Sequence, residues 1–135
     1  MAKAALNPFQ RIRADHQQET AEDYVELIAE LIAERGEARA TDVAKRLGVS
    51  NPTVNKTLKR LSDEGLIEQE PYRAIFLTVA GKRMAADGQR KHRIVEDFLM
   101  AIGISAETAR IDSEGIEHHV SAESLAAMAK FLGRD

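Results

Sequence analysis

Residues 41–63 contain two amphipathic stretches separated by a short turn, and this arrangement strongly limits the possible folds. We predict a short helix over 41–47 and a longer helix over 51–63, because apolar residues recur in both at helical spacing. Gly48 is placed to end the first helix, and Ser50 is suited to cap the second. The segment therefore predicts a helix, a tight turn and a second helix.

The sequence on either side extends this unit. Residues 19–35 place apolar side chains on one helical face and are followed by Gly36, which predicts a first helix. Residues 66–70 and 74–78 are short segments with apolar and β-branched residues, which predicts a hairpin. A winged helix-turn-helix has its parts in this order.

Three further helices are expected in the last third of the chain, over about 80–102, 106–118 and 122–132. Ser105 and Ser121 are suited to cap the second and third of these helices. The apolar side chains here exceed what a small winged-helix core requires, which predicts a dimer interface. These side chains are Phe98, Leu99, Ile102, Ile104, Leu125, Met128 and Leu132.

Charge and composition narrow the class of protein. The chain has no cysteine, so disulfides and thiolate metal sites are excluded. Its apolar runs are short and no secretory signal is evident, so we expect a cytoplasmic protein without a membrane partner. The net charge is −3, but residues 38–83 hold nine Lys and Arg against five Asp and Glu, a local charge of +4 that leaves −7 elsewhere. A basic middle between acidic ends favours a DNA-facing module joined to a cation-binding one.

The second helix of a helix-turn-helix inserts its first turn into the major groove, where short polar side chains contact base edges and cations contact phosphates. Asn51, Thr53 and Asn55 offer hydrogen bonds, and Val54 offers an apolar contact if it faces outward. Lys and Arg side chains along this helix and at the tip of the wing are placed to contact the phosphate backbone of DNA. The predicted DNA-binding residues are Ser50, Asn51, Thr53, Val54, Asn55, Lys56, Lys59, Arg60 and Arg73.

A second constellation consists of carboxylates and imidazoles. Glu114, Glu117 and His118 recur at spacing i, i+3, i+4 and so share one helix face, whereas His119 points about 100° away and suits a supporting or packing role. Asp23 and Glu26 are three residues apart on the first helix, and His92 lies on the long one. This set predicts a metal site.

The donor set indicates the kind of metal. Oxygen and nitrogen donors without sulfur favour Mn²⁺ or Fe²⁺. The four carboxylates carry −4, which two divalent cations would neutralise, so two ions per subunit are expected. Acidic helix faces are also commonly just solvated, and spacing alone leaves that interpretation open. A carboxylate-bridged di-metal enzyme would need Glu-x-x-His pairs, and no histidine here follows a glutamate at that distance, so we expect no enzyme.

Four segments carry a resemblance to the diphtheria-toxin-repressor family of metal-dependent transcription factors, in its manganese-responsive branch. They are residues 21–26, 41–61, 92–99 and 114–121, in the family's order and with similar intervals. The resemblance implies six metal ligands: Asp23, Glu26, His92, Glu114, Glu117 and His118. Asp23 stands where the iron-responsive branch would have Met, which favours manganese.

The resemblance also implies a function. We expect a homodimer that binds a palindromic operator in double-stranded DNA when Mn²⁺ bridges its domains, and that represses manganese uptake genes without using a small organic substrate. An iron- or broadly metal-responsive repressor, or a metal-independent winged-helix regulator, remain alternatives. With the last expected helix ending near residue 132, we expect no SH3-like domain of the kind that iron-responsive members carry.

The expected fold class is mainly α, with a winged helix-turn-helix followed by an all-helical dimerisation domain. We predict a flexible tail over 1–17, a DNA-binding domain over 18–79, and a metal-binding and dimerisation domain over 80–135.

Overall fold

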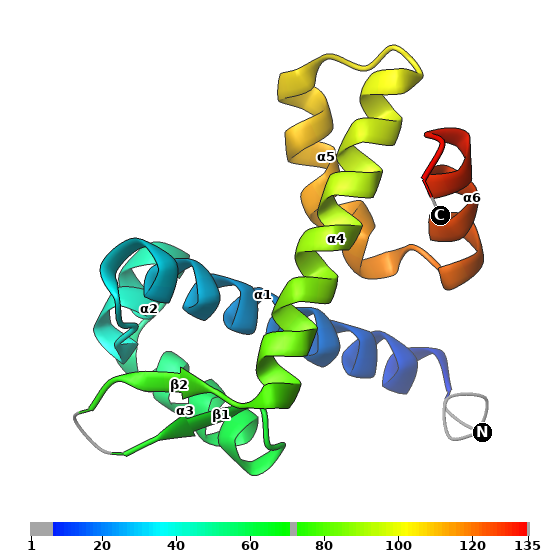
Figure 1. Cartoon of the computed structure of the whole chain (residues 1–135). Helices are drawn as coiled ribbons and strands as arrows, with labels where there is room; N and C mark the ends of the chain where they lie inside the picture. Colours follow the sequence, from blue (N-terminus) through cyan, green and yellow to red (C-terminus); the bar gives the residue numbers. More distant parts are fainter. Residues whose placement is uncertain (1–6, 71–72, 135) are drawn as a thin grey trace. The chain divides into compact units, whose positions relative to one another are not determined.

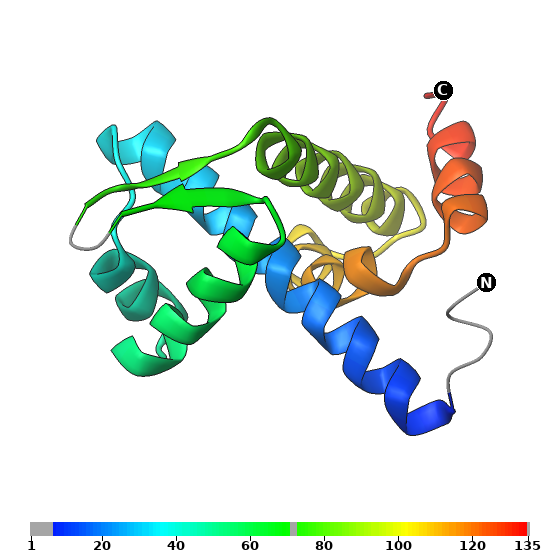
Figure 2. The same ribbon diagram turned by 90° about the horizontal axis from the view of Figure 1, so that it is seen from below.

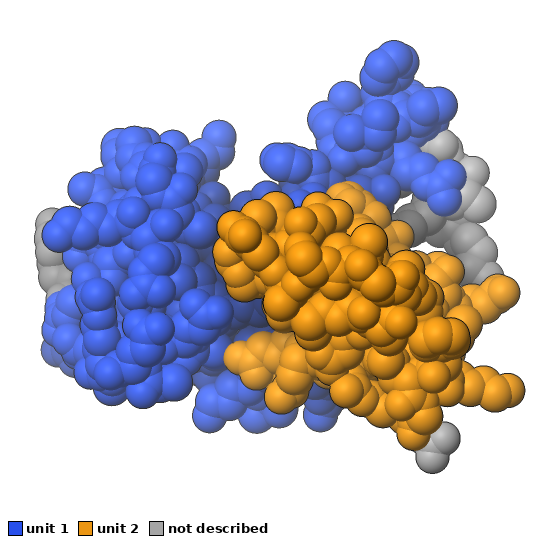
Figure 3. All heavy atoms as spheres, turned by 90° about the horizontal axis from the view of Figure 1, so that it is seen from above, with its two compact units in different colours: residues 1–85 blue, residues 86–135 orange. Residues whose placement is uncertain are grey.

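The computed structural model describes residues 7–70 and 73–134 of the chain. The chain forms two compact units, residues 1–85 and 86–135, which are coloured separately in Figure 3. The first unit contains α1 (Pro8–Arg35), α2 (Ala40–Leu47), α3 (Asn51–Asp63), β1 (Ile67–Gln69) and β2 (Ile75–Leu77). The second contains most of α4 (Val79–Ala101), with α5 (Ala106–His119) and α6 (Ala122–Phe131) (Figure 1). The fold is the predicted one, mainly helical with a small hairpin.

The helix-turn-helix forms because local signals agree with the apolar pattern. Gly48 ends α2 in the left-handed conformation at φ 69°, which glycine adopts without a steric penalty. The Ser50 hydroxyl accepts a hydrogen bond from the Thr53 backbone N–H at the start of α3. Both signals were predicted, and the helix bounds agree with prediction within one residue.

The wing is an antiparallel hairpin in which Ile67 pairs with Leu77 and Gln69 with Ile75. The backbone N–H of Ile75 also donates to the Ala38 carbonyl, so the segment after α1 adds a short bridge to the hairpin. The hairpin lies beside α3 (Figure 2). The predicted wing tip at residues 71–72 lies outside the described residues.

The first helix is longer than predicted. We expected residues 1–17 to form a flexible tail and the helix to begin at Glu19, but α1 begins at Pro8. Asn7 accepts from the Gln10 N–H at 2.8 Å, and the Gln10 side chain accepts from the Asn7 N–H at 3.0 Å. This reciprocal capping satisfies two backbone donors, so for residues 8–17 the prediction of a tail is wrong. Residues 1–6 lie outside the described part of the chain.

The first unit has one closed apolar core. It includes Ile28 and Leu31 from α1, Val43 from α2 and Leu58 from α3, all with at most 1% of their surface exposed. The beginning of α4 packs closely on this unit. A methyl group added to Gly81 would lie 2.0 Å from the Leu66 carbonyl oxygen, so only glycine permits this approach.

The second unit has a smaller apolar cluster, made of Ile94 and Val95 from α4 with Leu125 and Ala129 from α6. Phe98 and Phe131 meet edge to face, with ring centroids 5.3 Å apart. α5 runs back alongside the second half of α4 (Figures 1 and 2). The serine caps predicted for α5 and α6 are present, since Ser105 and Ser121 each accept a backbone N–H.

Several of the apolar residues predicted to form a dimer interface are instead buried in this cluster within the subunit. Leu125 is buried, and Leu99, Met128 and Leu132 pack against the same cluster. Ile102 and Ile104 are 54% and 36% exposed, and Ile111, Ile116 and Phe131 add further exposed apolar surface on α5 and α6. Within the described residues, no helix is long and apolar enough to cross a membrane.

Candidate metal centre and nucleic-acid interface

Three of the predicted ligands converge in the second unit. His92 on α4 and Glu114 and Glu117 on α5 each offer a donor atom, and these atoms lie within 4.8 Å of one another. Glu114 and Glu117 are one helical turn apart, which brings both carboxylates to the face that meets His92. The predicted clustering of these three residues is therefore present in the structure.

The imidazole of His92 is held on both edges. Its Nδ1 lies 3.0 Å from Glu117 Oε2, and its Nε2 lies 2.7 Å from Glu96 Oε2. The Ser113 hydroxyl donates to the Arg110 carbonyl and lies 3.4 Å from His92 Nδ1. The ring is therefore oriented with Nδ1 toward the carboxylates of α5.

Glu117 is the most unusual group of the cluster, because a carboxylate is seldom buried without a compensating charge. Only 4% of it is exposed, and this burial raises its pKa to about 7, against the opposing attraction of His92 and His118. Glu114 raises the pKa further by repulsion. A buried carboxyl with this pKa is a site where a divalent cation can take the place of a proton.

The remaining predicted ligands divide between the units. The His118 side chain is 2% exposed, with Nε2 3.5 Å from Glu117 Oε1. Asp23 and Glu26 belong to the first unit, where both are half-buried and one turn apart on α1. His119 is exposed and lines a groove between α5 and α6 with Ile116. His119 therefore lies apart from the His92 cluster, as its angular position predicts.

Two residues of this centre were not predicted. Glu96 contacts His92 from the next turn of α4, a spacing of i, i+4 that is visible in the sequence. Ser113 is fully buried beside His92, and no sequence signal marks it. Both act on His92 and belong to the same unit.

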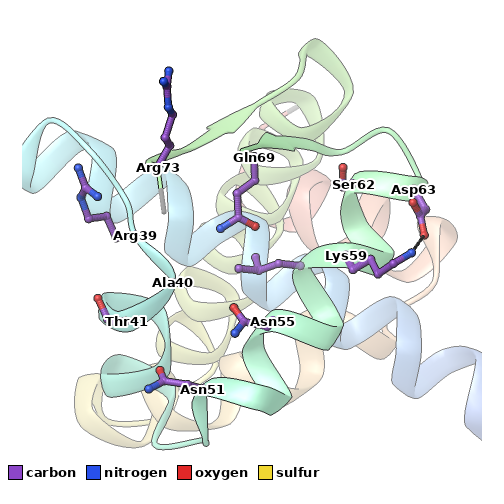
Figure 4. A pocket seen from close by; sticks show the side chains of 11 residues that line it. Arg39, Ala40, Thr41, Asn51, Asn55, Lys59, Ser62, Asp63, Gln69 and Arg73 are labelled. Carbon is purple, nitrogen blue, oxygen red and sulfur yellow. Dashed lines mark hydrogen bonds and ion pairs between the residues drawn. The ribbon is translucent and has the colours of Figure 1, made fainter. Parts of the chain in front are cut away.

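The predicted DNA-contacting residues lie along α3 and the wing. Asn51 and Asn55 are exposed one turn apart and line a hollow of about 790 Å³ that α3, the start of α2 and the hairpin enclose. In Figure 4, Asn55 and Gln69 point into this hollow from α3 and β1. Amides in this position can contact base edges.

One of these predictions is wrong, and another has a competing role. Val54 is fully buried in the first core, so it is unavailable for an apolar contact with DNA. Arg60 donates to the Gln17 carbonyl on α1 at 3.2 Å and so helps to hold α3 to α1. Ser50 and Thr53 are hydrogen-bonded to each other through their hydroxyls at 2.8 Å.

The remaining cations are placed on the exposed surface. Lys56 is exposed, and Lys59 pairs with Asp63 at 3.4 Å. Arg73 pairs with Glu70 at 3.2 Å and is one of the residues that line the hollow (Figure 4). Arg39, Thr41 and Gln69, which sequence reasoning missed, also line the hollow. They come from the start of α2 and from the wing, and only the folded hairpin brings them beside α3.

Two family models match the chain, one to each part. A model described as the iron-dependent repressor N-terminal DNA-binding domain matches residues 16–75, and one described as the iron-dependent repressor metal-binding and dimerisation domain matches residues 78–134. The chain therefore belongs to the iron-dependent repressor family of DNA-binding transcriptional regulators.

Within this family, the chain is similar to curated proteins that carry the name MntR. The transcriptional regulator MntR of Escherichia coli O6:H1 is 54% identical over 123 residues, which cover 91% of this chain and 79% of that protein. The HTH-type transcriptional regulator MntR of Bacillus subtilis is 39% identical, over 77% of this chain and 73% of that protein.

Solved structures agree with the fold. The manganese regulator SloR superimposes with a TM-score of 0.72 at 32% identity, and T. acidophilum IdeR superimposes with a TM-score of 0.73 at 31% identity. The alignments cover 85% of this chain for SloR and 84% for IdeR. This chain therefore spans about half the length of those proteins, 54% in each case. A manganese-dependent transcriptional repressor in complex with manganese is also similar, with a TM-score of 0.72.

Proposed function

We propose that this chain is a manganese-responsive transcriptional repressor that binds operator DNA as a homodimer, acts in the cytoplasm and controls manganese uptake genes. The observation that carries the proposal is the convergence of His92 and Glu114 on the buried carboxyl of Glu117. The high identity to proteins named MntR supports manganese as the metal.

The donors of this centre fit Mn²⁺. They are hard oxygen and borderline nitrogen atoms, which suit manganese better than a thiol-preferring metal. When bound, the ion would supply positive charge beside Glu117, whose burial otherwise favours the protonated form. His118, which contacts Glu117, is the fourth proposed ligand from this unit. With Asp23 and Glu26 the proposed set carries four carboxylates, enough to neutralise two divalent ions per subunit.

The proposed switch couples the two units through shared ligation. Asp23 and Glu26 on α1 would share the metal with His92, Glu114, Glu117 and His118, so that metal binding limits the motion of the DNA-binding unit. In a dimer, this restriction would favour recognition helices about 34–36 Å apart, the separation of successive major grooves. A coupling of about 1–3 kcal/mol is enough to change operator affinity about 5- to 150-fold.

The proposed DNA interface is the exposed side of α3 with the wing. Asn51 and Asn55 would contact base edges, while Lys56, Lys59 and Arg73 would contact phosphates. Homodimerisation is proposed through the second unit, where Ile102 and its exposed apolar neighbours would be covered by a second copy. The match to a dimerisation-domain model supports this assignment.

Operator affinity with and without metal tests the proposal. An operator is selected from random-sequence duplexes in the presence of Mn²⁺, and its affinity is measured with Mn²⁺ and with chelator. We expect wild type to bind about 5- to 150-fold more tightly with Mn²⁺. Glu26→Ala should lose this response, whereas Glu30→Ala, an exposed residue one turn further along α1, should keep it. Tight binding by Glu26→Ala, equal with Mn²⁺ and chelator, would exclude the switch.

The second candidate is an iron- or broadly metal-responsive repressor. The match to family models described as iron-dependent repressor domains supports this candidate. Operator affinity at matched free Mn²⁺, Fe²⁺ and Zn²⁺ separates the two, since equal activation by Fe²⁺ and Mn²⁺ would favour the second. Operator binding that chelator leaves unchanged would indicate a metal-independent regulator.

A further inference from the structure

Gln69 occupies a position in the wing where the strand pattern favours an apolar side chain. Successive residues of a strand point to opposite faces, so Gln69 lies on the same face of β1 as Ile67, which is 2% exposed. Its partner across the hairpin, Ile75, is fully buried. Gln69 is half-buried and borders the hollow beside α3. Its amide therefore points into the hollow instead of completing the apolar core (Figure 4).

The amides around this hollow have free hydrogen-bonding groups. Three of the side chains that line it are amides: Asn51, Asn55 and Gln69. Within the described residues, none of the three makes a side-chain hydrogen bond. Each amide offers two donor hydrogens and an acceptor oxygen. Gln69 and Asn55 present these groups to the same space from different elements, the wing and α3 (Figure 4).

The cations that line the hollow are compensated locally. Each forms an exposed ion pair with a nearby carboxylate, at 3.0–3.4 Å: Arg39 with Glu37, Lys59 with Asp63, and Arg73 with Glu70. Affinity for phosphates comes mainly from cations, whereas base edges are recognised by neutral donors and acceptors. The hydrogen-bonding capacity left free inside the hollow therefore suits a base edge better than a phosphate.

We propose that Gln69 is a specificity-determining residue that contacts a base edge in the major groove, next to the base that Asn55 contacts. The inference rests on the proposed DNA-binding function and adds a contact from β1 to those of α3. A glutamine amide can bind adenine through two hydrogen bonds, because it donates to N7 and accepts from the N6 amino group. A contact of this kind discriminates about 5- to 150-fold against the wrong base.

The base preferences of the full chain test this assignment. An operator is selected from random-sequence duplexes in the presence of Mn²⁺, and affinities are measured for all of its single-base variants. Asn55→Ala identifies the base pair that Asn55 contacts. Gln69→Ala should lose about 5- to 150-fold of discrimination at an adjacent base pair and keep the preferences elsewhere. Gln69→Glu is nearly isosteric, but its carboxylate only accepts, so the preference there should change from adenine to cytosine even if Gln69→Ala folds poorly.

Two control variants separate a base contact from other effects. Glu68→Gln alters the neighbouring residue of β1, whose side chain lies on the opposite face of the strand, and should keep all base preferences. Lys56→Gln removes an exposed cation of α3, so it should weaken binding to all duplexes alike and reduce the salt dependence of log affinity by about 0.9. Gln69→Ala should leave this salt dependence unchanged, because a neutral amide releases no counterion.

The possible failures are distinguishable. If no duplex is enriched from the random pool, the proposed DNA-binding function fails, and the role of Gln69 fails with it. If an operator is enriched but Gln69→Ala and Gln69→Glu both keep every base preference of wild type, the DNA-binding function stands and the role of Gln69 is overturned. Equal weakening by Gln69→Ala across all single-base variants would also overturn it, since a phosphate contact or a distorted hairpin has that effect.

Discussion

The two units bury different kinds of surface. Within the described parts of the chain, the first unit holds a cluster of sixteen buried apolar residues, whereas the second holds a cluster of four. Among the described residues, Ser113 and Glu117 are the buried polar and charged residues, and the His118 side chain is also only 2% exposed; all three lie in the second unit. The second unit also exposes Ile102, Ile111 and Phe131 by more than half.

This difference indicates how each unit is stabilised. A closed apolar core can support the first unit by hydrophobic burial alone. The second unit has a buried carboxyl, whose charge a proton or a cation would neutralise. It also has exposed apolar surface, which binding of a second copy of the chain would cover. The DNA-binding unit is therefore expected to be the structurally constant part, and the second unit the part that responds to metal and to dimerisation.

The largest expected effect is on the first core. Leu58→Ala removes a side chain that is 1% exposed, and such truncations cost about 2–5 kcal/mol of unfolding free energy. Leu125→Ala, in the cluster of four, should cost less because the site is less enclosed and can relax. Urea unfolding followed by amide signals of each unit measures both effects. A larger loss for Leu125→Ala would contradict the comparison.

Replacing one glycine by alanine in each unit tests how tightly the backbone is packed there. Gly81→Ala places a methyl group against the Leu66 carbonyl, and such overpacking costs about 1–3 kcal/mol. Gly115→Ala in α5 meets no atom within 4 Å and should instead stabilise by about 0.4–1 kcal/mol. Thermal unfolding of both variants checks the expected opposite signs; equal effects would show that α4 tolerates displacement at Gly81.

The buried carboxyl predicts a pH dependence in the second unit. The pKa of Glu117 is raised from 4.5 to about 7 in the fold, so the metal-free protein should lose stability as pH rises from about 4.5 through 7. Mn²⁺ needs the ionised form of Glu117, so its binding should weaken as pH falls below 7, by an amount that approaches about tenfold per pH unit for one displaced proton. Unfolding midpoints and Mn²⁺ affinities across this window test both trends.

Glu117→Gln is the control for this pH dependence. Its metal-free stability should lack the component lost between pH 4.5 and 7, because the amide does not ionise. A Mn²⁺ affinity of wild type that stayed constant between pH 6 and 7 would contradict the role of Glu117.

The smallest effect is expected at the start of α1. Asn7→Ala removes the reciprocal cap with Gln10, which costs about 0.5–1 kcal/mol at a typical cap. Phe9 and Ile12 in this first part of the helix are 73% and 65% exposed, so the loss should appear as local fraying. Cα chemical shifts of residues 8–13 should move toward coil values, while the unfolding midpoint of the core stays nearly constant. A large drop in that midpoint would show that this end of α1 supports the core.

Local signals explain which elements could be predicted. Gly48 and Ser50 mark the turn between α2 and α3, and the two elements were predicted within one residue. The start of α1 was missed because residues 8–18 have no apolar stripe to bury, and periodicity is the main signal for a helix. The capping pair Asn7 and Gln10 was present in the sequence and would have located the start.

The candidate site divides in the same way. Spacing on one helix predicted that Glu114 and Glu117 share a face, and the resemblance supplied His92 as a ligand from another helix. Val54 was assigned to DNA although the same periodicity that predicted α3 also places it on the buried face. Ser113 and Gln69 could not be predicted, because their neighbours come from other elements.

The sequence by itself determined the order of helices and wing, the family and the set of oxygen and nitrogen donors, because these follow from local periodicity, caps and residue types. Only the tertiary structure decided that Glu117 is buried, that His92 presents Nδ1 to it, and that Glu96 holds the opposite edge of the ring. The physical reason is that burial and hydrogen-bond geometry depend on which helices pack together, and the packing of α4 against α5 joins residues 25 positions apart.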